Sequence, residues 1–326
     1  MKVFKFGGAS VKDAAAVENV ARVIKQFPNM DLVVVISAMG KTTNALEDLL
    51  EEYASGGLAV AEKLDVIIDF HKKIAADLRI PDSNLEEQLD RLFGALRQQL
   101  EREPSDNYDF DYDQVGHAHQ LVSTAIISAY LKATGLDNTW TDARRLIRTD
   151  NRYREGRINW EKTEKIFVEK WAEVKSTAKK GARSIMITQG FIGHTDERNT
   201  TTLGREGSDF TAAISAFVLN ATDVTIWKDV PGMLNADPKW FDNTVLLEKI
   251  SFREAIELAY FGASVIHPRT IQPLKRKNIP LHIKSFVNPD TKGSVIQSSE
   301  EHDNTIPSFI FKMDQVLVSL SPKDFS

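Results

Sequence analysis

The chain has 326 residues, of which 42% are hydrophobic and 27% charged, and its formal net charge is −5. This size and composition are typical of a soluble globular protein with one large α/β domain or two ordinary ones. The slightly acidic balance predicts neither nucleic acid nor a membrane surface as a partner. Because cysteine is absent, disulfides, thiolate metal sites and cysteine nucleophiles are excluded. With no apolar run long enough to span a bilayer and no signal-peptide pattern, we expect a cytoplasmic protein.

The first predicted unit is a strand, a glycine turn and a helix. The strand at 3–6 contains Lys5 and runs into Gly7-Gly8-Ala9-Ser10, after which apolar residues recur at helical spacing as far as position 24. Adjacent glycines let backbone N–H groups approach a phosphate, and Lys5 would add a positive charge. The spacing matches neither the P-loop nor the dinucleotide-binding fingerprint. A plain turn beside a solvated lysine is therefore an equally good interpretation of this unit alone.

The next segments continue the alternation of strands and helices. A fully apolar strand at 32–37 is typical of a parallel sheet buried on both faces, and small and hydroxyl residues follow it at 37–44. Helices are predicted over 45–79, beginning near Ala45, and over 85–102, where the apolar stripe is assigned to packing. Residues 103–112 are predicted to form a surface loop.

The middle of the chain contains polar residues whose role the pattern leaves open. A helix predicted over 117–131 begins with His117 and His119. Two histidines two positions apart lie on different sides of a helix, which disfavours a shared metal site. The arginines within 144–157 are expected to be mostly solvated, and a carboxylate or phosphate contact by one of them stays open.

The stretch 199–213 most strongly indicates a binding site. It lies between a buried strand at 184–191 and a helix, and it holds three consecutive threonines, two glycines and Arg205. Ser208 and Asp209 are predicted to cap the helix, because their oxygens accept its first free N–H groups. A strand, a glycine-rich loop and a helix N-terminus together form an anion site at the carboxyl end of a sheet. An ordinary capped helix after a flexible loop has about equal weight on these spacings alone.

The remaining elements complete the predicted architecture. Strands are expected at 223–230 and 279–286, with a helix at 252–261 closed by Gly262. The alternation predicts a doubly wound, mostly parallel sheet. After about 297 a polar linker leads to two short strand-like runs. One hairpin cannot bury its own apolar face, so this segment either packs on the main domain or begins a second module.

Seven segments carry the pattern of one known family: KFGGAS (5–10), ISAMGKTTNAL (36–46), ITQGFIG (187–193), TTTLGREGSDFTAA (200–213), IWKDVPGMLNADPK (226–239), ELAYFGASVIHPRTI (257–271) and IPLHIKSF (279–286). Together they resemble the aspartate kinases of the amino acid kinase superfamily. The resemblance covers about 1–296 in the family's order, and it implies a three-layer αβα sandwich around a mostly parallel sheet. It also implies an aspartate lobe up to about 215 and a nucleotide lobe over about 216–296. Residues 297–326 resemble a linker and the first strands of a truncated ACT-like regulatory module of the α+β class.

The resemblance implies transfer of the ATP γ-phosphoryl group to the β-carboxylate of L-aspartate. The product, 4-phospho-L-aspartate, begins the route to lysine, threonine and methionine. A carboxylate is already ionised at neutral pH, so the reaction needs positioning and positive charge and no general base. The expected partners are ATP, L-aspartate and Mg²⁺ held mainly by the phosphates, and the expected assembly of the full-length form is a homodimer.

The resemblance also assigns roles to individual residues. Lys5 and Asp209 are the implied catalytic groups, and Asp209 is expected to take the substrate ammonium. No residue is implied as a direct metal ligand. The implied aspartate contacts are Ser37, Thr43, Gln120, Arg198 and Asn199, and the implied nucleotide contacts are Lys5, Gly7, Gly8, Ser10, Lys228, Asp229 and Lys239.

Three positions depart from the family pattern. Gln120 stands where the family has a glutamate that pairs with the substrate ammonium. An amide accepts a hydrogen bond but lacks the charge, and every ~1.4 kcal/mol forfeited weakens binding about tenfold. Some members carry arginine at the position of Asn199, for which Arg198 could substitute, and lysine at the position of Ser264. Two alternatives therefore stay open: a related kinase acting on another acid, and a non-catalytic regulatory subunit that binds a nucleotide or an amino acid.

Overall fold

The computed structural model describes residues 1–81, 83–179, 181–262, 265–298, 306–310, 316 and 318. Within these ranges one central sheet has the strand order β3-β4-β2-β1-β7-β9-β10-β8. Neighbouring strands are parallel except for the antiparallel pair β9 and β10, which confirms the predicted mostly parallel sheet. The strands are β1 (Lys2–Phe6), β2 (Leu32–Ile36), β3 (Thr139–Thr141), β4 (Ile185–Gln189), β7 (Asp223–Lys228), β8 (Lys249–Ser251), β9 (Leu281–Ser285) and β10 (Ser294–Gln297).

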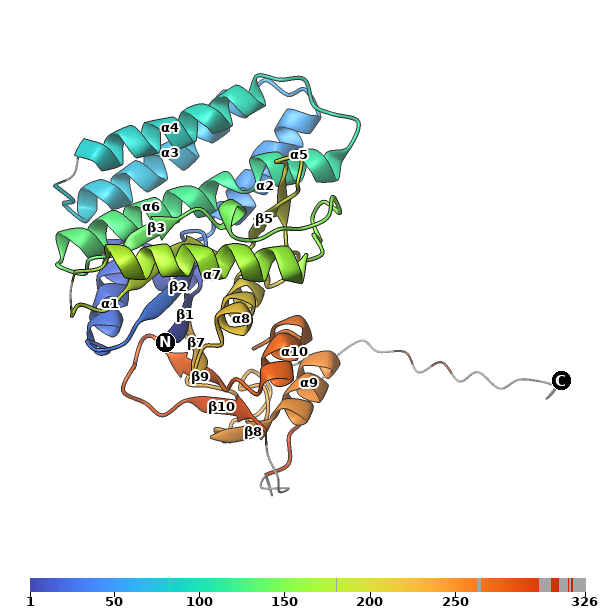
Figure 1. Cartoon of the computed structure of the whole chain (residues 1–326). Coiled ribbons are helices and arrows are strands. Elements are labelled where there is room, and N and C mark those ends of the chain that lie inside the picture. Colours follow the sequence, from blue (N-terminus) through green and yellow to red (C-terminus); the bar gives the residue numbers. More distant parts are fainter. Residues whose placement is uncertain are drawn as a thin grey trace.

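Helices cover both faces of the sheet, because its central strands are buried at almost every position and alternate residues point to opposite sides. Val3 of β1 belongs to one large buried cluster and Phe4 to a second. The first cluster includes side chains of α7 (Trp160–Thr177), α8 (Gly207–Leu219), α9 (Phe252–Phe261) and α10 (Pro268–Lys277). The second includes side chains of α1 (Ala14–Lys25), α3 (Val60–Asp77), α4 (Ser83–Leu100) and α6 (Ala118–Ala133). Figure 1 shows the resulting layers, with α3 and α4 side by side outside α6.

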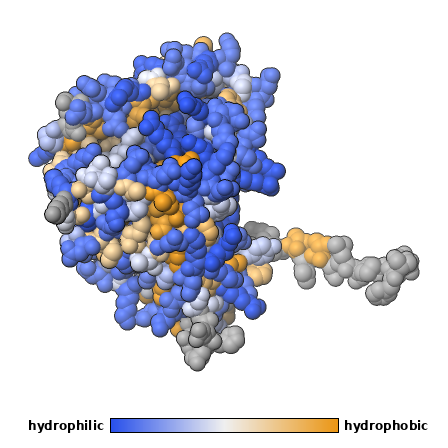
Figure 2. Space-filling model, in the orientation of Figure 1, coloured by the Kyte–Doolittle hydropathy of each residue, from blue (hydrophilic) through white to orange (hydrophobic). Residues whose placement is uncertain are grey.

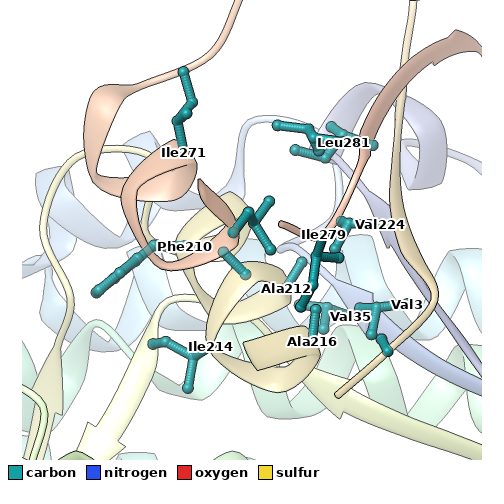
Figure 3. Packing of buried hydrophobic residues seen from close by; sticks show 14 of the residues in the cluster. Val3, Val35, Phe210, Ala212, Ile214, Ala216, Val224, Ile271, Ile279 and Leu281 are labelled. Carbon is teal, nitrogen blue, oxygen red and sulfur yellow. The ribbon is translucent and has the colours of Figure 1, made fainter. Parts of the chain in front are cut away.

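The packing of α8 explains how its N-terminus reaches the ends of the strands. Ala212 and Ala216 are fully buried, and Figure 3 shows them close to the sheet valines Val3 and Val35. Small side chains on this face let the helix axis approach the sheet closely. Burial of each valine contributes roughly 1.5–3 kcal/mol. The face shown in Figure 2 is in contrast mainly hydrophilic, with an apolar patch near its middle.

Two loop and helix predictions were wrong in detail. The helix predicted over 45–79 is two helices, α2 (Thr42–Ala54) and α3, and the chain turns between them at Gly56, where φ is +68°. The predicted surface loop at 103–112 includes the start of α5 (Tyr108–Val115). Asn107 begins this helix, because its side-chain oxygen accepts a hydrogen bond from the Phe110 N–H at 3.1 Å.

The predicted cap of α8 was also wrong. The helix begins at Gly207, so Ser208 and Asp209 lie inside its first turn. The N-cap residue is Glu206, which adopts the left-handed conformation at φ 54° and makes no side-chain capping bond among the described residues. Asp209 is therefore free to use its carboxylate for another purpose.

The segment after 297 is described only in part. Residues 306–310 take no regular structure and run beside 235–241, where the Phe309 N–H donates to Asn235 O at 2.7 Å. The other residues of the predicted strand-like runs, apart from 316 and 318, lie outside the described residues, as does Ser264. Within the described ranges, no helix has the length and apolar character needed to cross a membrane.

Candidate active site

The carboxyl ends of β1, β2 and β7 open into a cavity of about 890 Å³ that also touches the first turn of α8. Parallel strands end at the same edge of a sheet, so residues far apart in the chain meet there. The cavity is closed on another side by α2 and α6, through Thr43 and Gln120. Of the residues predicted to bind ligands, the wall includes Lys5, Gly8, Ser37, Thr43, Gln120, Asp209 and Lys228.

A buried carboxylate flanked by two lysines occupies the centre of this site. Lys5 Nζ lies 2.6 Å from Asp209 Oδ1, and Lys228 Nζ lies 3.4 Å from Asp209 Oδ2. Burial alone would raise the pKa of Asp209, but the two ammonium groups hold it below its ordinary value. Lys228 Nζ also donates a hydrogen bond to the carbonyl of Val265. Two positive charges and one negative charge leave a local excess of +1, which favours an anionic ligand.

Gly8 allows the backbone to close around this charge cluster. It begins the short 3₁₀ helix η1 (Gly8–Val11) directly after β1. A Cβ atom at this position would lie 2.9 Å from Gly40 O and 3.1 Å from Ala38 O, so a side chain would force apart the two loops that end β1 and β2. The backbone of Gly8 is thereby exposed to the cavity beside Lys5, as a phosphate site requires.

The N-terminus of α8 is held at the same place by a second close approach. A Cβ on Gly190, directly after β4, would lie 2.4 Å from Ser208 Cβ. One on Gly207 would lie 2.7 Å from a ring carbon of Phe191. The first turn of α8 therefore rests on the end of the sheet, and Ser208 and Asp209 line the cavity. The first N–H groups of a helix have no partner within the helix and attract anions.

Several predicted residues lie away from the cavity wall. Arg198 and Asn199 occupy the turn between β5 (Ile192–His194) and β6 (Thr200–Thr202), and Asn199 Nδ2 lies 3.4 Å from the Oη atom of Tyr153, which lines the cavity. Lys239 is exposed in a turn after Asp237. The wall likewise does not include Gly7, Ser10 or Asp229. The roles of these residues remain predictions from the resemblance.

The structure adds arginines that the sequence pattern left unassigned. Arg152, Arg154 and Arg205 all line the cavity. The guanidinium of Arg154 lies 4.4 Å from the ring centroid of Tyr112, which also lines it. Arg205 falls within the loop that the sequence marks as an anion site, so its position was the available signal. Arg152 and Arg154 belong to the cluster that we expected to be mostly solvated, and their place at the cavity depends on a left-handed turn at Arg154 (φ 65°).

Comparison with known proteins agrees with this geometry. The sequence model described as "Amino acid kinase family" matches residues 1–285. The chain belongs to this family. The lysine-sensitive aspartokinase 3 of Escherichia coli is 33% identical over 98% of this chain and 69% of its own length. The recognised resemblance of this amino acid kinase to the aspartokinases is thereby confirmed.

Two further proteins similar to this chain are also aspartokinases. A bifunctional aspartokinase/homoserine dehydrogenase 2 of Arabidopsis thaliana is 34% identical over 92% of the chain. The crystal structure of E. coli aspartokinase III in complex with aspartate and ADP matches with a TM-score of 0.83 and 32% identity over 93% of the chain. The chain spans 33% of the Arabidopsis protein and 65% of the crystallised one. The fold predicted from the sequence is confirmed for the kinase part.

Proposed function

We propose that the protein transfers the γ-phosphoryl group of ATP to the β-carboxylate of L-aspartate, giving 4-phospho-L-aspartate and ADP. The observation that carries this proposal is the Lys5–Asp209–Lys228 cluster, which lies in one cavity with Gly8 and the first turn of α8. The aspartokinase names of the relatives and the aspartate and ADP held by a structural neighbour support it. By this proposal the product enters the synthesis of lysine, threonine and methionine.

The proposed reaction uses the charges of the site on the transferred group. A β-carboxylate oxygen forms a bond to the γ-phosphorus while the bond from that phosphorus to the β,γ-bridging oxygen breaks, and ADP leaves with the electron pair. No proton has to be removed from the nucleophile, because a carboxylate is ionised at neutral pH. Lys5 and Lys228 would stabilise negative charge on the moving oxygens, with backbone N–H groups at Gly8 and α8 adding fixed dipoles.

The aspartate end of the site is proposed to lie where α2, α6 and the loop before α8 meet. Ser37, Thr43 and Gln120 supply polar groups there, and the exposed Arg205 provides a guanidinium that suits a carboxylate. Asp209 was predicted to take the substrate ammonium, but both of its oxygens face lysines. We therefore propose that Asp209 mainly fixes the positions of Lys5 and Lys228.

Magnesium is proposed to enter with the nucleotide. Among the described residues, no group of three or more histidine, aspartate or glutamate side chains is arranged to hold a metal ion. We therefore propose that the cation is bound chiefly by phosphates and water, as Mg²⁺ is in many kinases. Glu206, which lines the cavity and whose Oε2 is buried without a hydrogen-bond partner among the described residues, offers one carboxylate oxygen to it. Bound Mg²⁺ would neutralise charge on the phosphates.

The larger organisation is also part of the proposal. We propose an aspartate lobe up to about 215, a nucleotide lobe over about 216–296, and an ACT-like regulatory module that begins after 297. A homodimer of the full-length form and a cytoplasmic location, without nucleic acid or membrane partners, are inferred from the resemblance and the composition.

The two alternatives make different predictions in one assay. Acyl phosphate formed from ATP and L-aspartate can be trapped with hydroxylamine and measured as the hydroxamate. We expect a signal that requires both ATP and L-aspartate. Turnover of a different acid with L-aspartate inert would favour a related kinase, and ATP binding without transfer to any acid would favour a regulatory subunit.

A further inference from the structure

The wall of the cavity contains one buried amide oxygen without a partner. Gln120, in the first turn of α6, is only 4% exposed and lines the cavity. Among the described residues, no group donates a hydrogen bond to its Oε1. A buried acceptor of this kind is costly unless a ligand or water satisfies it. The oxygen is therefore available to a donor that enters the cavity.

The other end of the same amide contacts a histidine. Gln120 Nε2 lies 3.5 Å from His119 Nε2, and the same ring nitrogen lies 3.2 Å from Thr43 Oγ1. An amide nitrogen only donates hydrogen bonds, so His119 Nε2 accepts in this contact. Because this nitrogen then carries no proton, Thr43 Oγ1 donates to it as well, and its lone pair is shared between two cavity side chains from different helices, Thr43 in α2 and Gln120 in α6.

The histidine is held in the neutral form that this contact needs. His119 is 2% exposed, and burial, followed by the nearby His71 and His117, lowers its pKa to about 3. A neutral imidazole has one accepting nitrogen and one N–H. Since Nε2 accepts, Nδ1 carries the proton, and Nδ1 has no hydrogen-bond partner among the described residues.

The orientation of the Gln120 side chain matters because the two ends of an amide differ. A carboxylate at this position presents two equivalent accepting oxygens, and it needs no choice between them. An amide presents an acceptor at one end and two donors at the other, so a reversed Gln120 would direct N–H groups at a substrate ammonium.

We propose that His119 is a positioning residue: by accepting a hydrogen bond from Gln120 Nε2, it keeps Gln120 Oε1 facing the cavity as the acceptor for the ammonium group of an α-amino acid substrate. The proposal rests on the proposed function, because it assumes an amino acid ligand at this end of the cavity. It explains how the site tolerates an amide where a charged partner for the ammonium would otherwise be expected.

The test is a double-mutant cycle with L-aspartate as the varied substrate in the hydroxamate assay. His119→Leu keeps the bulk of the side chain and removes the acceptor. We expect KM for L-aspartate to rise about tenfold, with kcat and KM for ATP changing less than about twofold.

Gln120→Glu should lower KM for L-aspartate. In the Gln120→Glu background His119→Leu should change this KM less than about twofold, because both carboxylate oxygens accept. His71→Leu, which removes another buried histidine outside the cavity wall, is the matched control and should leave KM unchanged.

The outcomes separate this inference from the function on which it rests. If the unmodified protein neither binds nor phosphorylates L-aspartate, the proposed function fails and this inference fails with it. If it phosphorylates L-aspartate but His119→Leu raises KM equally in both backgrounds, only the inference fails, since His119 then has a general structural effect. A KM for L-aspartate that is higher in the single variant Gln120→Glu than in the unmodified protein would likewise overturn the inference. That result would mean that the amide nitrogen of Gln120, and not its oxygen, faces the substrate. Calorimetric titration of L-aspartate into each variant gives the same comparison without turnover.

Discussion

Lys5 and Asp209 form an ion pair of 2.6 Å between the second-to-last residue of β1 and the first turn of α8. These residues are 204 positions apart (209 − 5) in the chain. The Asp209 side chain is 2% exposed and that of Lys5 is 10% exposed, so the pair is shielded from water while the lysine still reaches the cavity. The pair fixes a positive charge at the place where the carboxyl ends of the strands meet a helix N-terminus.

Replacement of Lys5 should remove most of the activity. Lys5→Ala deletes a charge proposed to stabilise the transferred phosphoryl group, and loss of one such group typically lowers kcat by roughly 10²–10³-fold. Lys2→Ala is the control, since Lys2 lies in the same strand but pairs with Asp223 at 2.8 Å, away from the cavity wall. Steady-state hydroxamate assays of both variants check this. Comparable kcat values for the two variants would remove Lys5 from the chemistry.

The free energy of unfolding should depend on pH because of the buried Asp209 carboxylate. Lys5 and Lys228 hold the pKa of this buried carboxyl below its ordinary value of 3.8. Its charge therefore stabilises the fold at pH values above about 4, and the contribution is lost as the pH falls through the lowered pKa. Asp209→Asn should reduce the free energy of unfolding at pH 7 by about 1–3 kcal/mol, and the difference should shrink below pH 4. Urea denaturation from pH 7 to pH 3 measures it; a constant difference would contradict the pairing.

Gly8 should tolerate no side chain. In Gly8→Ala the new Cβ would lie 2.9 Å from Gly40 O, a backbone atom that cannot move without shifting the loop. We expect a lower melting temperature and a several-fold rise in KM for ATP. Gly94→Ala is the matched control, because its Cβ would meet nothing within 4 Å inside α4, and alanine there should stabilise the helix by about 0.5–1 kcal/mol. Equal behaviour of the two variants in thermal melts would show that the close approach is unimportant.

The comparison of Arg205 with Arg198 tests which arginine serves the substrate carboxylate. Arg205 lines the cavity, whereas Arg198 lies in the turn between β5 and β6. Arg205→Ala should raise KM for L-aspartate by about 10–100-fold, the loss expected for a charge-assisted hydrogen bond. Arg198→Ala should leave it within about twofold. Measured KM values in the reverse order would support the assignment made from the sequence resemblance.

Much of this site could be predicted from the sequence because it follows the ends of strongly patterned strands. The strands predicted at 32–37 and 184–191 contain the buried parallel strands β2 and β4, and the glycine and threonine stretches after strands mark the cavity. Side-chain partners were harder to predict. The capping prediction for Asp209 was wrong because α8 begins at Gly207, so Asp209 lies inside the first turn and its carboxylate pairs with two distant lysines. A local pattern contains no information about such long-range pairs.

The position of Arg154 also could not be predicted from a local sequence pattern. Arg154 reaches the cavity because its backbone is left-handed and its N–H donates to the buried Asp113 at 2.9 Å. Neither feature is visible in a run of charged residues. The helix α5, which begins at Tyr108, was likewise hidden in an acidic and aromatic segment whose helix signals are the Asn107 cap and the acidic first turn with Asp109 and Asp111.

The proposed binding of ATP and L-aspartate at Lys5, Gly8 and Arg205 is tested most directly by a crystal structure of the protein with a non-hydrolysable ATP analogue, Mg²⁺ and L-aspartate. We expect phosphate oxygens within hydrogen-bond distance of Lys5 Nζ and of the backbone at Gly8. We also expect the amino acid beside Arg205, with its ammonium group near Gln120 Oε1. A nucleotide bound away from Gly8 and Lys5, or an amino acid bound outside the cavity that Asp209 lines, would contradict this proposal.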